Sequence, residues 1–232
     1  NVSATIRYGR VDNSDYQLAD IYVQDIDCLV NAFGRGKYFT GPDLMQRMFD
    51  VTAGAIVAIN GDYYSVHHYG PLIRDGVSYI EKIDKNWDIA VLLNDGVFLT
   101  YEYRTLTKEE LSRLNVYQTW VFGPSLLDAN GHAKTVFRSG VMPKNPRTVL
   151  GYYEPGHYAF LTVDGRSHES RGMTIEELSR LSEQLGFLRA YNLDGGQSSI
   201  MMSRSGPINN PCEGGRPISD IFVVREIQQD KP

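Results

Sequence analysis

The chain has 232 residues, of which 42% are hydrophobic and 22% charged, so it can bury a sizeable core and does not have a disordered composition. Its formal net charge of −5, without a Lys/Arg cluster, argues against a nucleic-acid-binding protein. No apolar run approaches the ~18 residues of a transmembrane segment, and no signal peptide opens the sequence. Because the chain starts at Asn1 and not Met, we expect that a leader or anchor has been removed.

Fifteen Tyr and 22 Gly against two Trp indicate a β-rich protein with many turns. The two cysteines, Cys28 and Cys212, are too few for a disulfide framework. They lack CxxC or Cys/His spacing, so we expect no zinc site. They form either one long-range disulfide, if the protein is exported, or two buried thiols.

The first part of the chain predicts strands with one helix. Residues 4–8 and 18–27 are rich in β-branched and aromatic side chains, which favours two strands. Apolar side chains at helical spacing predict a helix over residues 42–49. Residues 54–60 form a short, continuous apolar run, typical of a strand buried on both faces. The run ends at Asn60-Gly61, which is either a simple turn or a polar site at the mouth of a buried strand.

The middle of the chain predicts two hairpins separated by a short helix. Residues 88–101 carry a central Asn-Asp-Gly turn, which predicts a hairpin. A capping box at 107–110 predicts a helix start, and residues 117–127 predict a strand. Residues 147–153 and 157–163 are expected to pair through a Glu-Pro-Gly turn.

The clearest helix covers residues 175–185, with an apolar stripe and a capping box formed by Thr174 and Glu177. It connects a strand that ends at Asp164 with one that leads to Asp194. If these two strands are parallel neighbours, both carboxylates emerge at the same edge of the sheet.

Strands at 198–203 and 218–227 complete the chain, which has no linker, repeat or low-complexity segment. We therefore predict a single domain over residues 1–232, with residues 1–49 contributing its first strands and helix. The fold class is α+β, with twisted, mostly antiparallel β-sheets and a few packed α-helices.

The stretch Ala190–Ser199 delivers one carboxylate, Asp194, to a glycine turn followed by two hydroxyls. Glycines let a backbone approach a ligand closely, and consecutive turn N–H groups can bind an anion. The alternative is an ordinary β-turn that contains Asp-Gly-Gly. Other polar clusters at expected strand ends contain carboxylates and arginines, and arginine binds phosphate in a bidentate manner.

Five motifs, occurring in this order, resemble the phosphodiester glycosidase family. They are Asn60-Gly-Asp-Tyr-Tyr64, Pro146-Arg-Thr148, Val163-Asp-Gly-Arg166, Ser170-Arg-Gly-Met-Thr174 and Asn192-Leu-Asp-Gly-Gly-Gln-Ser-Ser199. The resemblance covers about residues 50–226. The family's best-known member removes an N-acetylglucosamine cap from a sugar phosphodiester.

The resemblance implies a hydrolase that cleaves the glycosidic bond of a sugar-1-phosphodiester, such as an N-acetylglucosamine-1-phosphoryl group on a glycan or cell-envelope polymer. It also implies an extracellular or cell-envelope location for a bacterial member. The implied catalytic residues are Asp194 and Asp164. The implied substrate- and phosphate-binding residues are Asn60, Gly61, Arg147, Thr148, Arg166, Gly195, Gly196, Ser198, Ser199 and Arg216.

Within this set, Asp194 is the first choice for nucleophile or general base, while Asp164 is either its partner or a residue that orients Arg166. If both carboxylates are catalytic, a separation of about 5 Å favours retention and roughly 6.5–9.5 Å inversion. Gln197 replaces a third glycine that the family usually shows, and a positive φ there would be strained by about 1 kcal/mol or more.

Three alternatives stay open. A phosphodiesterase would attack phosphorus instead of the sugar carbon, and a non-enzymatic exported module would bind an anionic exopolysaccharide or cell-wall glycopolymer. We expect no metal ligands and no cofactor. The third alternative is that the aspartate-rich turns bind a divalent cation such as calcium.

Overall fold

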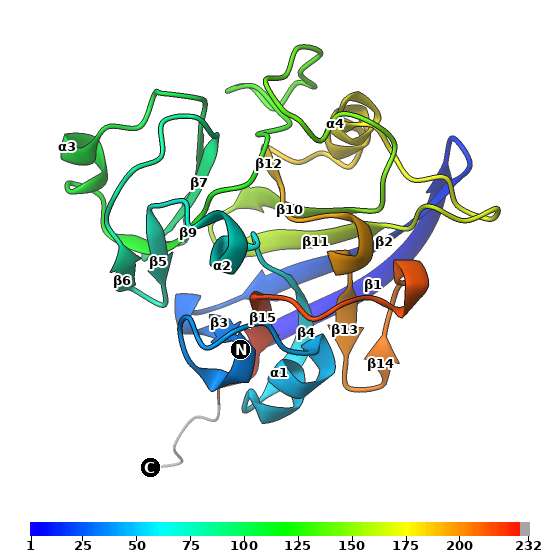
Figure 1. Ribbon diagram of the computed structural model, residues 1–232, viewed down its shortest axis with the longest axis horizontal. Helices are drawn as coiled ribbons and strands as arrows, with labels where there is room; N and C mark the ends of the chain where they lie inside the picture. The colour runs from blue at the N-terminus through cyan, green and yellow to red at the C-terminus, as the bar shows by residue number, and fades with distance from the viewer. Residues whose placement is uncertain (228–232) are drawn as a thin grey trace.

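Two five-stranded antiparallel sheets form the centre of the molecule (Figure 1). The computed structural model describes residues 1–227. The first sheet has the order β1–β2–β11–β10–β12, formed by Val2–Val11, Ser14–Val23, His157–Val163, Arg147–Glu154 and Arg189–Asn192. The second has the order β14–β13–β4–β15–β3, formed by Gly206–Pro207, Met201–Ser203, Ala55–Asn60, Asp220–Arg225 and Leu29–Phe33.

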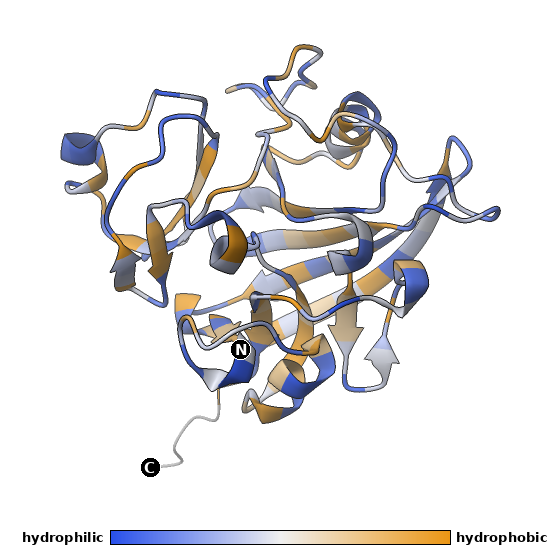
Figure 2. Cartoon of the chain, viewed as in Figure 1, coloured by the Kyte–Doolittle hydropathy of each residue, from blue (hydrophilic) through white to orange (hydrophobic). Residues whose placement is uncertain are grey.

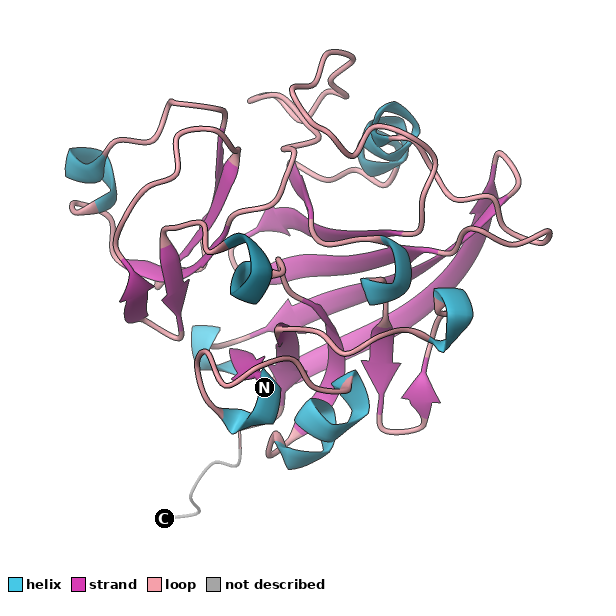
Figure 3. Cartoon of the chain, viewed as in Figure 1, coloured by secondary structure: helices cyan, strands magenta, loops and turns pink. Residues whose placement is uncertain are grey.

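Two smaller sheets lie beside this centre, and the helices are short (Figure 3). The three-stranded sheet has the order β8–β7–β9, formed by Phe98–Tyr101, Ile89–Leu93 and Val116–Trp120. The two-stranded sheet pairs β5 with β6, formed by Leu72–Arg74 and Val77–Ile80. The α-helices α1 to α4 are Met45–Val51, Tyr64–His67, Lys108–Leu111 and Ile175–Gln184. Four 3-10 turns, η1 to η4, cover Ile26–Cys28, Gly34–Gly36, Gly196–Ser198 and Cys212–Gly214.

The hydrophobic core is layered. Side chains of both large sheets share one cluster, in which Phe160 of β11 and Phe222 of β15 have ring centroids 5.6 Å apart. The face of the first sheet that points away from this shared cluster is covered by α4. The corresponding outer face of the second sheet is covered by α1. Figure 2 shows hydrophobic residues along the strands and hydrophilic residues at the tip of the β1–β2 hairpin. The layers therefore follow the alternation of apolar and polar side chains.

Most of the expected elements are confirmed, and the α+β fold with mostly antiparallel sheets is confirmed as well. Both halves of the capping box at α4 are present. The hairpin of β10 and β11 has the register that pairs Arg147 with Val163. The strand expected over 117–127 ends earlier, at Trp120, and the strand expected from residue 198 begins at Met201, after a 3-10 turn.

The strands before Asp164 and Asp194, β11 and β12, are not neighbours in the sheet. Strand β10 lies between them and pairs antiparallel with both. Two strands that are each antiparallel to a common neighbour run in the same direction, so both still end at the same edge of the sheet. Cys28 and Cys212 are free, buried thiols. Within residues 1–227, no helix has the length and apolar character needed to cross a bilayer.

Candidate active site

The candidate site lies at the edge where β11 and β12 end, β10 begins, and β4 of the other sheet ends. Asn60, the last residue of β4, joins these elements from a buried position. Its side-chain amide donates to the backbone oxygen of Asp194 at 2.8 Å, and its oxygen accepts from the Thr148 hydroxyl at 2.7 Å. The same oxygen accepts from the Ile200 N–H. Asn60 and Thr148 therefore hold the Asp194 segment in place and are not free to bind a ligand with these atoms.

Asp194, Arg216 and Ser198 form the centre of the site. The Asp194 carboxylate accepts from Nη2 of Arg216 at 2.7 Å and from the Gly195 N–H at 2.9 Å. Nε of Arg216 donates to the Ser198 hydroxyl at 2.7 Å. The Asp194 side chain is 10% exposed and the Arg216 side chain 33% exposed. Burial raises the pKa of the Asp194 carboxyl, while Ser198 and Arg216 oppose that rise.

The glycine turn after Asp194 is closely packed on the neighbouring loop. A Cβ on Gly195 would lie 2.7 Å from the carbonyl oxygen of Pro146, so only glycine fits there. Gly196 has a φ of +66° and donates its N–H to the same carbonyl. Gln197 does not have a positive φ, so the strain considered for it is absent, and its side chain bonds to Glu213.

Arg166 is the exposed cation of the site. It has a φ of 60°, and its Nε donates to the side-chain oxygen of Asn145 at 2.8 Å. Its Nη2 lies 3.2 Å from the point where a Cβ of Gly196 would stand. The guanidinium thus reaches over the glycine turn, and no carboxylate within residues 1–227 pairs with it.

Asp164 lies at the same sheet edge but is held by amide donors. Its carboxylate accepts from Gln17 at 2.9 Å, from the Asn209 side chain at 3.0 Å and from the Asn210 N–H at 3.1 Å. Asn209 also bonds to Ser199 and Met201. Burial raises the pKa of Asp164, and the bonds from Asn209 and Gln17 oppose it. Asp164 therefore anchors the loop that carries Arg216, and it makes no direct bond to Asp194 or Arg166.

Arg147 starts β10 at this edge, yet its guanidinium points into the loops behind the site. It is buried and donates to the backbone oxygens of Met173, Val141 and Pro143. Burial, followed by the nearby charge of Arg166, lowers the pKa of Arg147 to about 10. The guanidinium remains charged at neutral pH and organises the surrounding loops.

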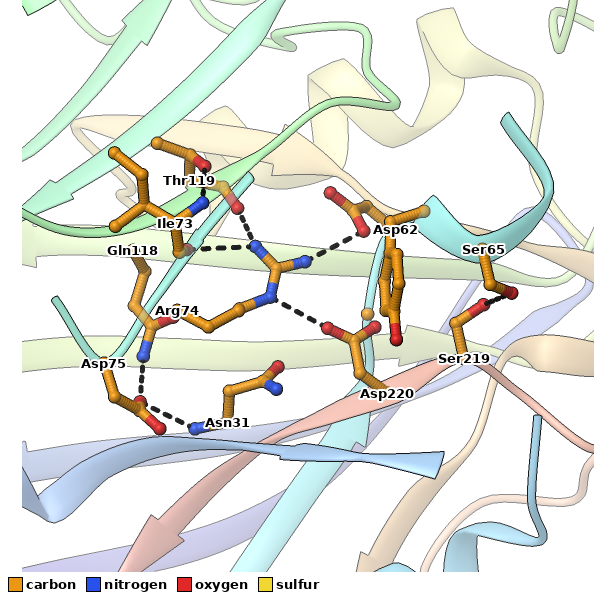
Figure 4. Close-up of polar contacts among 12 residues, drawn as sticks. Asn31, Asp62, Ser65, Ile73, Arg74, Asp75, Gln118, Thr119, Ser219 and Asp220 are labelled. Atoms are coloured by element: carbon orange, nitrogen blue, oxygen red, sulfur yellow. Dashed lines mark hydrogen bonds and ion pairs between the residues drawn. The ribbon is translucent and has the colours of Figure 1, made fainter. Parts of the chain in front are cut away.

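Asp62, Arg74 and Asp220 form a buried ion-pair network (Figure 4). Arg74 bonds to Asp62 at 2.9 Å and to Asp220 at 2.8 Å, and all three side chains are at most 2% exposed. Asp62 also accepts from the Val121 N–H. Burial raises the pKa of Asp220 to about 6, although Arg74 lowers it. The network fixes the backbone on either side of Gly61, whose N–H donates to the Asp220 carbonyl.

Sequence reasoning missed several of these residues. Asp220 is the first residue of the buried strand β15, Asp62 follows the buried strand β4 by two residues, and Arg74 ends the short strand β5. A charged side chain at the end of an apolar strand is a signal for a buried ion pair. Tyr63 packs on the Arg216 guanidinium, with 4.5 Å between Arg216 Cζ and the ring centroid. Ser199, in contrast, was expected at the site but is 1% exposed, and its hydroxyl makes no hydrogen bond.

Within residues 1–227, no group of three or more His, Cys, Asp or Glu side chains is placed to hold a metal ion. The arrangement offers one carboxylate bonded to one arginine, a second exposed arginine, and a glycine turn between them. Chemically, these groups can bind a phosphate beside a carboxylate.

A model of the phosphodiester glycosidase family matches residues 53–225. The SPbeta prophage-derived uncharacterized protein YomE of Bacillus subtilis (strain 168) is 30% identical over 189 residues. That match covers 76% of this chain and 29% of YomE, so the chain spans less than a third of this relative's length.

Two solved structures have the same fold. One is the catalytic domain of zebrafish N-acetylglucosamine-1-phosphodiester alpha-N-acetylglucosaminidase, auto-inhibited by its pro-peptide. Its TM-score is 0.76 at 18% identity, over 98% of this chain and 83% of that chain. The other is a hypothetical protein from Synechocystis, with a TM-score of 0.63 at 10% identity, over 96% of this chain and 62% of that one. With its family motifs gathered at one sheet edge and the family match spanning most of its length, the chain belongs to the phosphodiester glycosidase family.

Proposed function

We propose that this chain hydrolyses the glycosidic bond of a sugar-1-phosphodiester and releases a free sugar and a phosphate monoester. The observation that carries the proposal is the pairing of Asp194 with Arg216 beside the glycine turn over which Arg166 reaches. A carboxylate can activate the water that attacks the sugar carbon, and an arginine can bind the phosphate.

Asp194 is the general base in this proposal. In this proposal a water molecule adds to the anomeric carbon, and its proton passes to Asp194. The bond between that carbon and the phosphate oxygen breaks, and its electron pair leaves with the phosphate monoester. Because this leaving group is already weakly basic, it needs little protonation, so one carboxylate suffices for proton transfer.

Arg216 and Arg166 bind the phosphate. Arg216 uses Nε and Nη2 for Ser198 and Asp194, which leaves Nη1 free for a phosphate oxygen. Arg166 reaches the same turn at Gly196 and is exposed. Together they neutralise the charge that develops on the leaving group. Asp164 and Arg147 act as positioning residues, because their polar atoms are committed to holding the surrounding loops.

The proposal is tested with a panel of sugar-1-phosphodiesters, beginning with N-acetylglucosamine, assayed for free sugar with and without a chelator. Hydrolysis in oxygen-18 water is expected to place the label on the sugar. Label in the phosphate would show attack on phosphorus and overturn the assignment. Binding of an anionic glycopolymer with no product release from any substrate would instead favour a binding module.

The pH dependence of kcat/KM gives a second test, because Asp194 must be ionised to act. Burial raises its pKa, so activity is expected to rise with pH through a limb above the ordinary value of 3.8. Arg216→Gln removes a charge that stabilises the ionised form, so it should move this limb to higher pH as well as slow the reaction. The control Arg7→Gln, which affects an ion pair with Asp20, should leave the limb in place. A limb at or below 3.8, or one that Arg216→Gln does not move, would contradict the role of Asp194.

We further propose that the sugar belongs to a cell-envelope glycan or exopolysaccharide and that the protein works outside the cytoplasm. The resemblance to a glycan-trimming family supports this proposal. Fractionation of the producing cells, followed by detection of the full-length protein, tests the location.

A further inference from the structure

A row of aromatic side chains continues outward from Arg216. The guanidinium lies over the ring of Tyr63, and that ring meets His67 edge-on, with centroids 5.5 Å apart. His67 stacks on Tyr69 at 5.1 Å and an interplanar angle of 6°, and Tyr69 stacks on Trp87 at 5.1 Å. We call Tyr63, His67, Tyr69 and Trp87 the aromatic row. It begins in contact with a residue of the proposed active site.

The aromatic row lies at the rim of a core cluster, against which Tyr69 and Trp87 pack. All four of its members are partly exposed, whereas Trp120 and Tyr191 are at most 1% exposed. The Tyr191 hydroxyl is used within the fold, where it donates to the Asp88 carbonyl. For the aromatic row, the structure records no hydrogen bond from a phenol, imidazole or indole group to another residue within 1–227. Its polar atoms are therefore available to a ligand.

The start of the row is held in a strained backbone conformation. Tyr63 has a φ of 64°, in the left-handed region that bulky residues rarely adopt. Such a conformation costs about 1–3 kcal/mol and persists only where neighbouring structure fixes it. Here the neighbouring Asp62 is bound by Arg74, and Ser65 of α2 bonds to Ser219 at 2.6 Å. This arrangement places the Tyr63 ring beneath Arg216.

Partly exposed rings whose phenol, imidazole or indole groups make no hydrogen bond within the protein suit a ligand with apolar faces and hydroxyl groups. A pyranose ring has both. The order of contacts runs from Asp194 to Arg216 and then to the aromatic row. If Asp194 faces the anomeric carbon and Arg216 the phosphate, the row faces whatever is esterified to the other side of that phosphate. We propose that the aromatic row is the binding site for a second sugar ring, the one that leaves with the phosphate. This inference rests on the proposed function.

Trp87 allows this binding to be measured without turnover. The chain has two Trp residues, and the other, Trp120, is buried in the core. With Asp194→Asn to prevent hydrolysis, a hexose ester of N-acetylglucosamine 1-phosphate should produce a saturable change in Trp fluorescence. The methyl ester of the same sugar phosphate should produce a much smaller change, and Trp87→Phe should remove the response. An equal response to both esters would overturn the proposal.

Kinetics on the otherwise unchanged protein gives an independent test. Tyr69→Ala should lower kcat/KM for the hexose ester by about tenfold, the equivalent of one lost ring contact, and change that for the methyl ester by less than about twofold. The control Tyr8→Ala removes a 71% exposed ring on β1 and should affect neither substrate. An equal fall for both esters would show a structural role, and a stronger effect on a nucleoside ester would show a base-stacking site. Either result overturns the proposal. Absence of sugar release from every ester would refute the proposed function, while the fluorescence titration would still decide whether the row binds a sugar.

Discussion

Asp194→Asn is expected to lower turnover by about 10²–10⁴-fold, because in the proposed mechanism it removes the group that accepts the proton of the attacking water. The substitution keeps the shape of the side chain and an oxygen to accept from the Gly195 N–H. Arg216 loses its charged partner, but its side chain is 33% exposed, so water can solvate it and the fold should survive. The measurement is kcat on a sugar-1-phosphodiester, with the thermal unfolding midpoint recorded for the same preparation.

Asp20→Asn is a matched control for this substitution. Asp20 is also a nearly buried carboxylate, bonded to Arg7 at 2.7 Å and to His157 at 2.7 Å, but it lies away from the site on β2. Its replacement should affect stability and leave kcat within about twofold. Asp164→Asn should retain a measurable fraction of turnover, because Asp164 acts only through the loop of Arg216. Retained activity in Asp194→Asn, or complete loss in Asp164→Asn alone, would exchange the two roles.

Arg74→Met is expected to destabilise the fold by about 3–5 kcal/mol, because it leaves two buried carboxylates without their cation. Asp62 and Asp220 are at most 2% exposed, so neither can turn to water. The free energy of unfolding is measured by denaturant titration of the wild type and the variant.

The stability lost in Arg74→Met should increase as the pH rises. Burial already raises the pKa of Asp220 to about 6 in the folded state, and removal of Arg74 raises it further. The folded variant then binds protons more readily than the unfolded chain, so its stability is favoured at low pH and falls as pH rises through the folded pKa. The difference from wild type should thus be larger at pH 8 than at pH 5.

The control Arg47→Met removes an ion pair between Arg47 of α1, whose side chain is 72% exposed, and Asp43, which precedes the helix. It should change stability by less than about 1 kcal/mol at either pH. A small effect of Arg74→Met that does not vary with pH would show that the network contributes little to stability.

Local patterns predicted the elements well, and they predicted some of the site. The helix α4 follows from its capping box and apolar stripe, and the hairpin of β10 and β11 follows from its turn. Asp194 stood out because a carboxylate preceded two glycines at the end of an apolar run. Each of these signals lies within a few residues of sequence, where propensity and turn chemistry act.

The roles of Asp164 and Arg74 depend on partners far away in the sequence. The carboxylate of Asp164 is bonded to Gln17 and Asn209, and Arg74 joins Asp62 to Asp220. No local pattern distinguishes an arginine that binds phosphate from one that binds backbone carbonyls, because both are arginines at a strand end. These partners meet only because strands distant in the sequence, such as β2 and β11 or β4 and β15, are neighbours in the sheets, and no local pattern predicts that pairing.

The chain crosses from the first large sheet to the second between β12 and β13, and Asp194 lies within that crossing. Its position is therefore set by where two sheets meet and not by the length of any surface loop. We expect that the segment around α3, which takes no part in the crossing, can gain or lose residues without moving the carboxylate. If Asp194 is the reactive group, as we propose, a change of substrate requires changes only in the residues that surround it.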